Sequence, residues 1–416
     1  MLALDEGILS LKILFITPRL PYPPYKGDKL RAYHQIKYLS RRHSVTLCSF
    51  IESKDELSYI DELEKYCECI ETILLKPYFS YLNAFFYAFS WIPLQVGYYH
   101  SKKMKKKIDE LLEREQFDII HTQLVRMTPY TKDHGKSPKV LDMVDTLSLN
   151  MKRRLEREKL HMKPLLHLEY MKLEKYEADI GKVFDKVIVC SESGKQFLSY
   201  DGNVTVCPNG VDTDFFYFTE STEGSSSDLC FLGNMGYFPN VDAVLFFVKK
   251  IFPLVKKKIS DVKFYIVGIN PPGCIRNLAR KYQDIMVTGF VEDVRSYLKK
   301  AAVAVYPIRS GSGIQNKVLE AMASGTPVVA TPYALEGIQV NPEEHAIMAD
   351  KPEEFASRVV ELLADAGLRR HLATNARRLM ENVYDWDAYG RELETIYASA
   401  IALHSKSNPT KVAYGD

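Results

Sequence analysis

The sequence predicts an α/β protein with two doubly wound parallel sheets that face a cleft. Short apolar runs of strand length alternate with helical patterns along most of the chain, which is typical of parallel sheets covered by helices. This alternation stops in a stretch rich in Gly and Ser near residues 199–227 and then starts again. The length of 416 residues also favours more than one hydrophobic core.

The composition is typical of a folded protein. Hydrophobic residues make up 46% of the chain and charged residues 26%. A net charge of +2 gives no general case for nucleic-acid binding. The seven cysteines are scattered, several of them in apolar runs, which favours reduced thiols and a cytoplasmic protein. We expect no signal peptide, because residues 1–10 contain Asp5 and Glu6 and lack a basic start.

The first predicted domain, residues 1–203, opens with an apolar strand at residues 12–17. A loop rich in Pro and Tyr follows, and Asp28 can cap the next helix. The loop lacks Gly-x-Gly-x-x-Gly, which argues against a dinucleotide site of that type. Gly27 either lets the backbone approach a ligand or forms a plain helix-entry turn. Further strands are expected at residues 45–50, 70–75, 118–121, 140–143 and 186–190.

An uncharged, aromatic segment at residues 78–99 interrupts this domain. Its length would allow a transmembrane span, but its polar residues and its Tyr and Trp content favour a helix at a membrane interface. A helix buried between domains is the alternative. A cluster of lysines that suits an anionic surface follows: Lys102, Lys103, Lys105, Lys106 and Lys107. We therefore predict a cytoplasmic protein in peripheral contact with the inner face of the cytoplasmic membrane.

The second predicted domain, residues 204–384, begins with a short strand at residues 204–207. Its other strands are expected at residues 229–232, 264–267, 285–288, 303–306 and 328–331. Helices are expected around residues 241–252, 275–282, 294–301 and 316–323, and three more near the end of the chain at 352–363, 368–381 and 386–403.

The stretch from Arg309 to Pro327 carries the strongest functional signal. It is predicted to form a Gly/Ser loop between a buried strand and a helix that starts near Asn316. In an open α/β sheet, ligands bind at the carboxyl ends of the strands, and free N–H groups at a helix start suit an anion. Lys317 adds a cation, and Glu320 follows at i+3 on the same helical face. This pattern predicts a nucleotide-sugar site; the alternative is a tight turn that caps a helix, with solvated charges.

The segment Lys-Val-Leu-Glu-Ala-Met-Ala-Ser-Gly-Thr-Pro-Val-Val at residues 317–329 matches a motif of a known family, as do residues 208–212, 287–291 and 384–386. With these segments, nearly the whole chain resembles glycosyltransferases of family 4, which have the GT-B fold. Residues 18–24, 142–145 and 231–242 are similar to sugar transferases of bacterial exopolysaccharide clusters. The resemblance implies Rossmann-like acceptor and donor domains, with residues 385–416 packing back on the first.

The resemblance also implies roles for individual residues. Glu320 would bind the donor ribose, the segment at residues 289–291 would hold the base, and Gly27 would border the diphosphate from the first domain. The expected donor-binding residues are Gly27, Asn209, Gly233, Asn234, Gly289, Phe290, Val291, Arg309, Ser312, Gly313, Ile314, Lys317 and Glu320.

Three positions depart from the family pattern. Ser312 stands where a Glu is usual, eight residues before Glu320. Residues 233–236 replace the usual Arg/Lys pair, and Gln123 replaces the second His of a His-x-His motif.

Glycosyl transfer requires a stabilised leaving diphosphate and an oxocarbenium-like transition state. Lys317, Arg309 and the N–H groups of residues 312–314 could stabilise the diphosphate without a metal. No Asp-x-Asp motif lies where it could hold a divalent ion between a strand and the phosphate. Asp142 and Asp145 could orient acceptor hydroxyls or act as a base; helix capping is the alternative.

The expected catalytic residues are Asp145, His121 and Lys317, although His121 is also explained as a satisfied histidine at a strand end. The resemblance implies retention of configuration, with the donor phosphate assisting deprotonation of the acceptor. No cofactor is expected, because the nucleotide sugar is a substrate.

The predicted function is sugar transfer from a nucleotide-sugar donor to a polysaccharide or polyprenyl-linked glycan acceptor in exopolysaccharide or cell-envelope glycan synthesis. One alternative is a protein of the same fold that binds nucleotide sugar or glycan without turnover, as Ser312 and Gln123 suggest. Another is a nucleotide-sugar epimerase. The base, the sugar, the acceptor and the linkage stay open.

Overall fold

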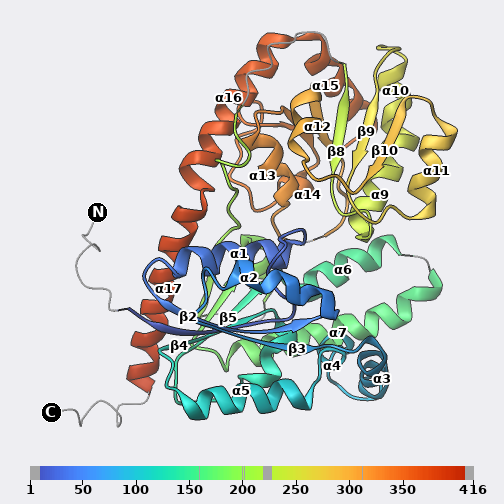
Figure 1. Cartoon of the computed structure of the whole chain (residues 1–416). Coiled ribbons are helices and arrows are strands. Elements are labelled where there is room, and N and C mark those ends of the chain that lie inside the picture. The colour runs from blue at the N-terminus through green and yellow to red at the C-terminus, as the bar shows by residue number, and fades with distance from the viewer. Residues whose placement is uncertain are drawn as a thin grey trace. The chain divides into compact units, whose positions relative to one another are not determined.

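The computed structural model describes residues 10–158, 160–198, 200, 202–218, 227–311 and 313–407. These residues form two compact units (Figure 1). Unit 1 contains the chain up to Cys207 and again from Tyr389, and unit 2 spans Pro208–Ala388. From the sequence, the domain boundaries were expected between residues 203 and 204 and between residues 384 and 385.

The described part of unit 1 contains a seven-stranded parallel sheet with the order β3-β2-β1-β4-β5-β6-β7. Because it is covered on both faces, its strands are almost continuously apolar, and this is the signal that made them predictable. Their bounds are β1 Lys12–Thr17, β2 Ser44–Ile51, β3 Cys69–Leu74, β4 Ile119–Gln123, β5 Lys139–Val144, β6 Lys186–Val189 and β7 Val204–Val206.

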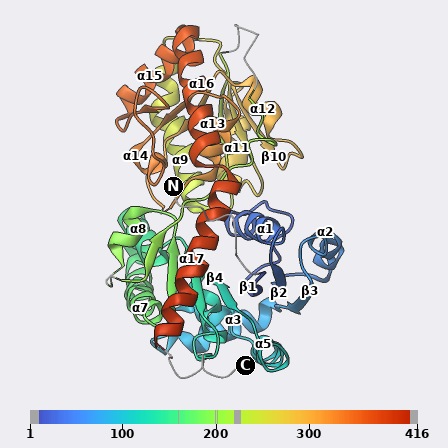
Figure 2. The ribbon, with the colours of Figure 1, turned by 90° about the vertical axis from the view of Figure 1, so that its left-hand side faces the viewer.

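Helices cover both faces of this sheet. Helix α5, Lys102–Arg114, packs Met104 and Ile108 into a core with Leu14 and Phe50. Helix α1, Gly27–Leu39, lies on the opposite face (Figure 1). Helix α17, Trp386–Ser407, closes the chain, and Figure 2 shows it running across the sheet beside β4.

The other elements of unit 1 connect these layers. They are η1 Lys54–Tyr59, α2 Ile60–Leu63, α3 Pro77–Ala88, α4 Leu94–Tyr98, η2 Val125–Tyr130, α6 Leu147–Arg157, η3 Leu160–Met162, α7 Lys163–Gly181 and α8 Glu192–Phe197. The uncharged aromatic segment of the sequence therefore forms two helices, α3 and α4. No helix within the described ranges combines the length and apolar character needed to cross a membrane.

The described part of unit 2 contains a six-stranded parallel sheet with the order β10-β9-β8-β11-β12-β13. The strands are β8 Leu229–Leu232, β9 Phe264–Val267, β10 Ile285–Gly289, β11 Val303–Tyr306, β12 Val328–Ala330 and β13 Ile347–Met348. The helices are α9 Phe238–Phe246, η4 Phe247–Ile251, α10 Phe252–Lys256, α11 Gly273–Lys281, α12 Arg295–Lys300, α13 Asn316–Ala323, α14 Pro332–Leu335, α15 Pro352–Ala364 and α16 Ala366–Val383.

The predicted fold class of two doubly wound parallel sheets is confirmed, and all strands expected from the sequence are present. Strand β13 was not predicted, because a run of two residues, Ile347–Met348, carries no periodic signal. The single helix expected at residues 241–252 is divided: α9 ends at Phe246, and a π-helical turn joins it to α10.

Candidate functional site

The loop between β11 and α13 lies at the carboxyl end of a parallel strand, as the sequence predicts. Gly311 and Gly313 have φ values of 122° and 73°, which side chains other than glycine adopt only with strain. Ile308 and Ile314 are buried on either side and anchor the loop. The Tyr306 hydroxyl donates to the carbonyl of Lys317 at 2.9 Å and fixes the helix start. Ser312 lies outside the described residues.

Lys317 and Glu320 lie in the first turns of α13. The Lys317 ammonium donates to Gln315 Oε1 at 2.6 Å. Burial lowers the pKa of Lys317 to about 8, although the Glu320 charge acts in the opposite direction. Burial likewise raises the pKa of Glu320 to about 7, against the attraction of Lys317. Both groups therefore change charge near neutral pH, and a bound phosphate would favour the charged form of Lys317.

Arg309 forms an ion pair within unit 2. Its Nε and Nη2 atoms donate to Asp242 Oδ2 and Oδ1 of α9, at 3.0 and 2.5 Å. Its guanidinium also lies over the Phe246 ring, 4.1 Å from the centroid. A two-point ion pair of this kind neutralises the charge and fixes its direction. In this structure, Arg309 thus connects the loop after β11 to helix α9.

The loops after β8 and β9 are in close backbone contact. Gly268 has a φ of 146°, and a Cβ atom added there would lie 1.9 Å from the carbonyl oxygen of Gly233. Asn234 is fixed locally, because its Oδ1 accepts from the N–H of Gly236 at 2.8 Å and its carbonyl from Asn240 Nδ2 at 2.9 Å. Residues 233–236 thus supply no cationic side chain at the position where the resemblance implies an Arg/Lys pair. Gly268 was not predicted as a site residue. The feature that could have indicated it is its position directly after the apolar strand β9.

The remaining expected donor residues of unit 2 lie at the same sheet edge. Gly289 ends β10 with a φ of 71°, and Phe290 after it is 55% exposed. Asn209 Nδ2 donates to Asn316 Oδ1 at 2.8 Å, which ties residues 208–212 to the first residue of α13. Because all strands of this sheet are parallel, the loops after β8, β10 and β11 share one edge, where ligands of open α/β sheets bind.

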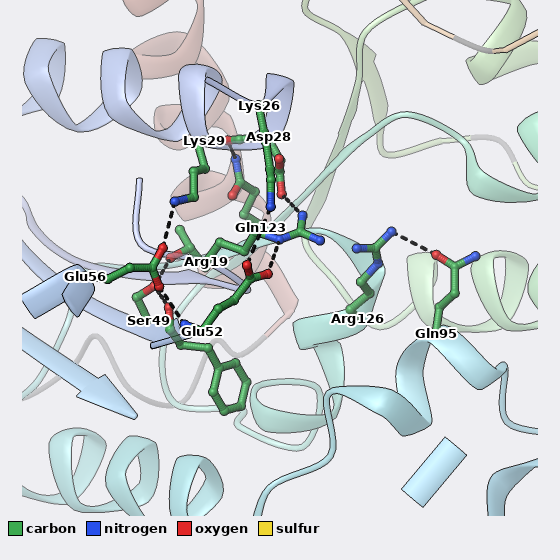
Figure 3. Close-up of polar contacts among 12 residues, drawn as sticks. Arg19, Lys26, Asp28, Lys29, Ser49, Glu52, Glu56, Gln95, Gln123 and Arg126 are labelled. Atoms are coloured by element: carbon green, nitrogen blue, oxygen red, sulfur yellow. Dashed lines mark hydrogen bonds and ion pairs between the residues drawn. The ribbon is translucent and has the colours of Figure 1, made fainter. Parts of the chain in front are cut away.

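A charged cluster occupies the corresponding edge of unit 1 (Figure 3). Arg19 donates from Nη1 to Asp28 Oδ2 at 2.6 Å and from Nε to Glu52 Oε1 at 3.0 Å. Gln123 Nε2 donates to the carbonyl of Asp28 at 2.9 Å. Burial alone would raise the pKa of Asp28, but Arg19 and Arg126 hold it below its usual value. Gly27, the first residue of α1, is exposed beside this cluster.

His121 is fully buried in unit 1. Its ring stacks on Phe15 at 4.1 Å, and its Nδ1 lies 2.8 Å from the hydroxyl of Tyr397 in α17. Burial lowers the pKa of His121 to about 4, against the attraction of Asp142. Its Nε2 is buried without a hydrogen-bond partner among the described residues, so His121 is a buried histidine whose hydrogen bonding is only partly satisfied.

Asp142 and Asp145 have different surroundings. Asp142 is fully buried, and its Oδ2 accepts from Arg31 and Gln35 at 2.6 and 2.7 Å. Asp145 is partly exposed and follows Val144, whose φ of 61° is unusual for a β-branched residue.

The first N–H groups of α6 are capped from another helix. Glu177 of α7 accepts from the N–H groups of Leu147 and Ser148 at 2.8 and 3.2 Å. No pattern in the sequence predicts this contact, because Glu177 lies 30 residues away from Leu147. In the parts of the chain that the structure describes, no three His, Cys, Asp or Glu side chains gather as metal ligands.

Comparisons with known proteins agree with this geometry. Residues 226–365 match the family model described as "Glycosyl transferases group 1". An uncharacterized 44.6 kDa protein in the cps region of Klebsiella pneumoniae is 22% identical over 391 residues, covering 90% of this chain and 96% of its own.

Two solved structures are similar in fold. Sucrose-phosphate synthase from Thermosynechococcus elongatus has a TM-score of 0.71 at 17% identity, covering 94% of this chain and 99% of its own. Anabaena Alr3699/HepE in complex with UDP has a TM-score of 0.68 at 13% identity, covering 94% and 100%.

The two parallel-sheet units define a protein of the GT-B fold. Within that fold, the second unit carries the segment that matches glycosyl transferases group 1, and the chain is similar over most of its length to the protein of the cps region. That segment contains β8 to α15, including the complete loop and helix with Lys317 and Glu320.

Proposed function

We propose that the protein transfers a sugar from a nucleotide-sugar donor to a polysaccharide or lipid-linked glycan acceptor, with retention of configuration. The observation that carries this proposal is the glycine loop after β11, followed by Lys317 and Glu320 at the start of α13. The UDP complex of the Anabaena protein supports a nucleotide-sugar donor. The relative in a cps region supports a role in exopolysaccharide or cell-envelope glycan synthesis.

In this proposal, unit 2 binds the donor. The backbone N–H groups at the start of α13 and the Lys317 ammonium attract the diphosphate and stabilise it as it leaves. Glu320 accepts hydrogen bonds from the ribose hydroxyls. The backbone of residues 289–291 contacts the base, and the donor phosphate takes the acceptor proton.

Unit 1 then orients the acceptor. Asp145 is the carboxylate we propose for contact with an acceptor hydroxyl, because it is partly exposed at the carboxyl end of β5. The buried Asp142 and His121 support β4 and β5 from within, and we propose no substrate contact for them.

We also propose peripheral contact with an anionic membrane through an aromatic surface. This surface comprises Tyr78, Phe79, Tyr81, Phe85, Phe86, Phe89 and Trp91, in α3 and the turn after it. Phe89 and Trp91 are 82% and 66% exposed. An exposed group of rings this large on a helix without charges is unusual for a surface in contact only with water, and Trp and Tyr suit the depth of lipid headgroups.

Hydrogen bonds to helix α7 hold the aromatic surface in place within unit 1. Lys172 of α7 donates from Nζ to the carbonyl of Ala88 at 2.9 Å. Glu169 of α7 accepts from the N–H groups of Leu94 and Gln95, at 3.1 and 3.4 Å. Beside these contacts, α7 adds exposed apolar side chains at Leu165, Leu168 and Met171.

Three of the five lysines after the aromatic surface lie close to carboxylates, which reduces the positive charge that they offer to anionic lipid. Lys105 and Lys106 pair with Asp109 and Glu110 of the same helix, at 2.6 and 3.6 Å. Lys107 lies 3.4 Å from Glu71. Lys102 and Lys103 stay exposed, and they are the members of the cluster that we propose for attraction to anionic lipid.

The donor site is tested by thermal shift of the full-length protein with UDP-, GDP-, ADP- and TDP-sugars. We expect one nucleotide to stabilise the protein, and Lys317→Ala to abolish that stabilisation. The matched control is Lys351→Ala, which removes an exposed lysine from the same unit. Stabilisation that persists in Lys317→Ala would remove Lys317 from the site.

A specific observation favours the alternative of binding without turnover: Asp242 neutralises Arg309, which removes one cation from the proposed stabilisation of the leaving group. Donor consumption in the presence of cell membranes separates the two functions. Release of the nucleoside diphosphate with transfer of the sugar supports the transferase, whereas tight donor binding with no release supports the binding protein.

A further inference from the structure

Arg126 has an incompletely satisfied guanidinium at the carboxyl edge of the unit 1 sheet. It lies in η2, directly after β4. Its Nη2 donates to Gln95 Oε1 at 2.8 Å, and its guanidinium lies 5.5 Å from the centroid of the Tyr99 ring. Its Nε is buried with no hydrogen-bond partner among the described residues. A buried donor without a partner costs free energy, so this position favours a ligand that accepts the bond.

The neighbouring cations are already paired. Arg19 forms ion pairs with Asp28 and Glu52 at 2.6 and 3.0 Å. Lys26 and Lys29 lie 3.6 and 3.1 Å from Glu52 and Glu56 respectively.

In the described parts of the chain, no carboxylate lies within ion-pair distance of Arg126; its drawn polar contact is the one with Gln95 (Figure 3). Its charge is nevertheless felt at Asp28, whose pKa it helps to lower despite the effect of burial. Arg126 is therefore the cation of this cluster that is available to an anion.

The backbone before Arg126 supports a functional role. Leu124 joins β4 to η2 with a φ of 65°, in the left-handed region that leucine rarely adopts. Backbone strain of this kind is concentrated at ligand sites. Here it directs the chain so that the Arg126 side chain leaves the sheet edge toward α4.

Gln95 connects this position to the aromatic surface. It belongs to α4, which begins three residues after Trp91. Glu169 fixes the same helix by accepting from the Gln95 N–H at 3.4 Å. A ligand held by Arg126 therefore lies one short helix away from the side chains that we propose to contact lipid. The molecule that suits both is an amphiphile whose phosphate adjoins its hydrocarbon chain.

We propose that Arg126 binds the phosphate of a lipid-linked acceptor, whose hydrocarbon chain extends toward the aromatic surface. This inference rests on the proposed function and specifies its acceptor class. The outer N–H groups of the guanidinium that Gln95 does not use supply the charge-assisted contact. Asp28 and Glu52, held by Arg19, leave the cluster with limited positive charge, so a small phosphate group is favoured over a polyanion.

The test compares three probes with the full-length protein by calorimetry below micellar concentration: farnesyl phosphate, farnesol and inorganic phosphate. We expect farnesyl phosphate to bind at least about tenfold more tightly than the other two. Arg126→Met, which retains the apolar stem, should lose about tenfold or more of that affinity. The matched control is Arg114→Met, which removes an exposed arginine of the same unit.

The possible outcomes are distinct. Unchanged farnesyl phosphate affinity in Arg126→Met would overturn the proposal. Equal binding of farnesol would exclude the phosphate contact, and equal binding of inorganic phosphate would assign the site to free phosphate instead of lipid. Arg126→Gln, which keeps a donor for Gln95, gives the same comparison should the methionine variant fail to fold. Donor binding is measured separately, so a failure of the donor site leaves this result unaffected.

Discussion

Arg31 Nε donates to Asp142 Oδ2 at 2.6 Å, and both side chains are fully buried. This ion pair joins α1 to the carboxyl end of β5 inside unit 1. Gln35 Nε2 donates to the same carboxylate oxygen at 2.7 Å and to the Tyr389 hydroxyl at 2.5 Å, which extends the network to α17. The pair thus holds together segments that are far apart in the sequence.

Loss of one partner of this pair should destabilise unit 1. Arg31→Met leaves the Asp142 charge buried and uncompensated, at a cost of about 3–5 kcal/mol in the free energy of unfolding. The double variant with Asp142→Asn should recover much of that loss. Denaturant unfolding of the three proteins checks this prediction, and equal destabilisation by the single and double variants would contradict it.

Glu320 should make the stability of the unliganded protein depend on pH. Its pKa is about 7 in the folded protein, above the ordinary value of 4.5, because burial disfavours the charged form. Its contribution to stability is therefore fully present below about pH 4.5 and lost as the pH rises through about 7. Relative to Glu320→Gln, the wild type should lose on the order of 1–3 kcal/mol between about pH 5 and pH 8. Parallel melting curves across this range would contradict the assignment.

Donor affinity should depend on the carboxylate of Glu320. Glu320→Ala removes two expected hydrogen bonds from ribose hydroxyls to a charged acceptor, so binding of the nucleoside diphosphate should weaken by about 2–4 kcal/mol. A 2′,3′-dideoxy nucleotide should bind the wild type as weakly as the natural nucleotide binds the variant. Glu353→Ala, which changes an exposed carboxylate of unit 2, serves as control in the same calorimetric titrations.

Trp91 should report membrane binding directly. The chain has two tryptophans, and Trp386 is buried, so Trp386→Phe leaves Trp91 as the single, exposed fluorophore. With vesicles of phosphatidylglycerol and phosphatidylethanolamine, its emission should shift to shorter wavelength as the ring enters the headgroup region. The triple change Phe85→Ser, Phe86→Ser and Phe89→Ser should abolish the shift. Tyr282→Ser, at an exposed ring of unit 2, should preserve it.

An unaltered emission spectrum at saturating vesicle concentration would exclude insertion of the aromatic surface. Added salt distinguishes the two contributions to vesicle binding. Screening weakens the attraction of Lys102 and Lys103 to anionic lipid, whereas the contribution of the aromatic rings persists.

Much of the fold followed from the sequence because buried parallel strands are short, continuous apolar runs. The loop at residues 309–315 was predictable for a related reason: its glycines and serines separate such a strand from a helix with Lys317 and Glu320. The partners of charged side chains were not predictable. The pairing of Arg309 with Asp242 and the capping of α6 by Glu177 depend on which helices become neighbours in three dimensions.

The aromatic segment illustrates the same limit. Its composition predicted an interfacial helix, but the composition does not show which rings remain outside the core. The structure exposes most of them, whereas Tyr87 packs against Gly97 of α4. The sequence likewise does not show that Lys107 lies 3.4 Å from Glu71. No sequence pattern indicates the proposed role of Arg126 either, since its partner Gln95 lies 31 residues before it.

The contact between Gly268 and the carbonyl of Gly233 has a consequence for how this site can diversify. No side chain can be introduced at position 268 without separating the two loops, so the ends of β8 and β9 form a frame that tolerates little change. In the proposed donor site, we therefore expect changes of donor preference to occur in the loops after β10 and β11. Engineering of donor specificity should begin at those two loops as well, with exposed Phe290 as the first position to vary.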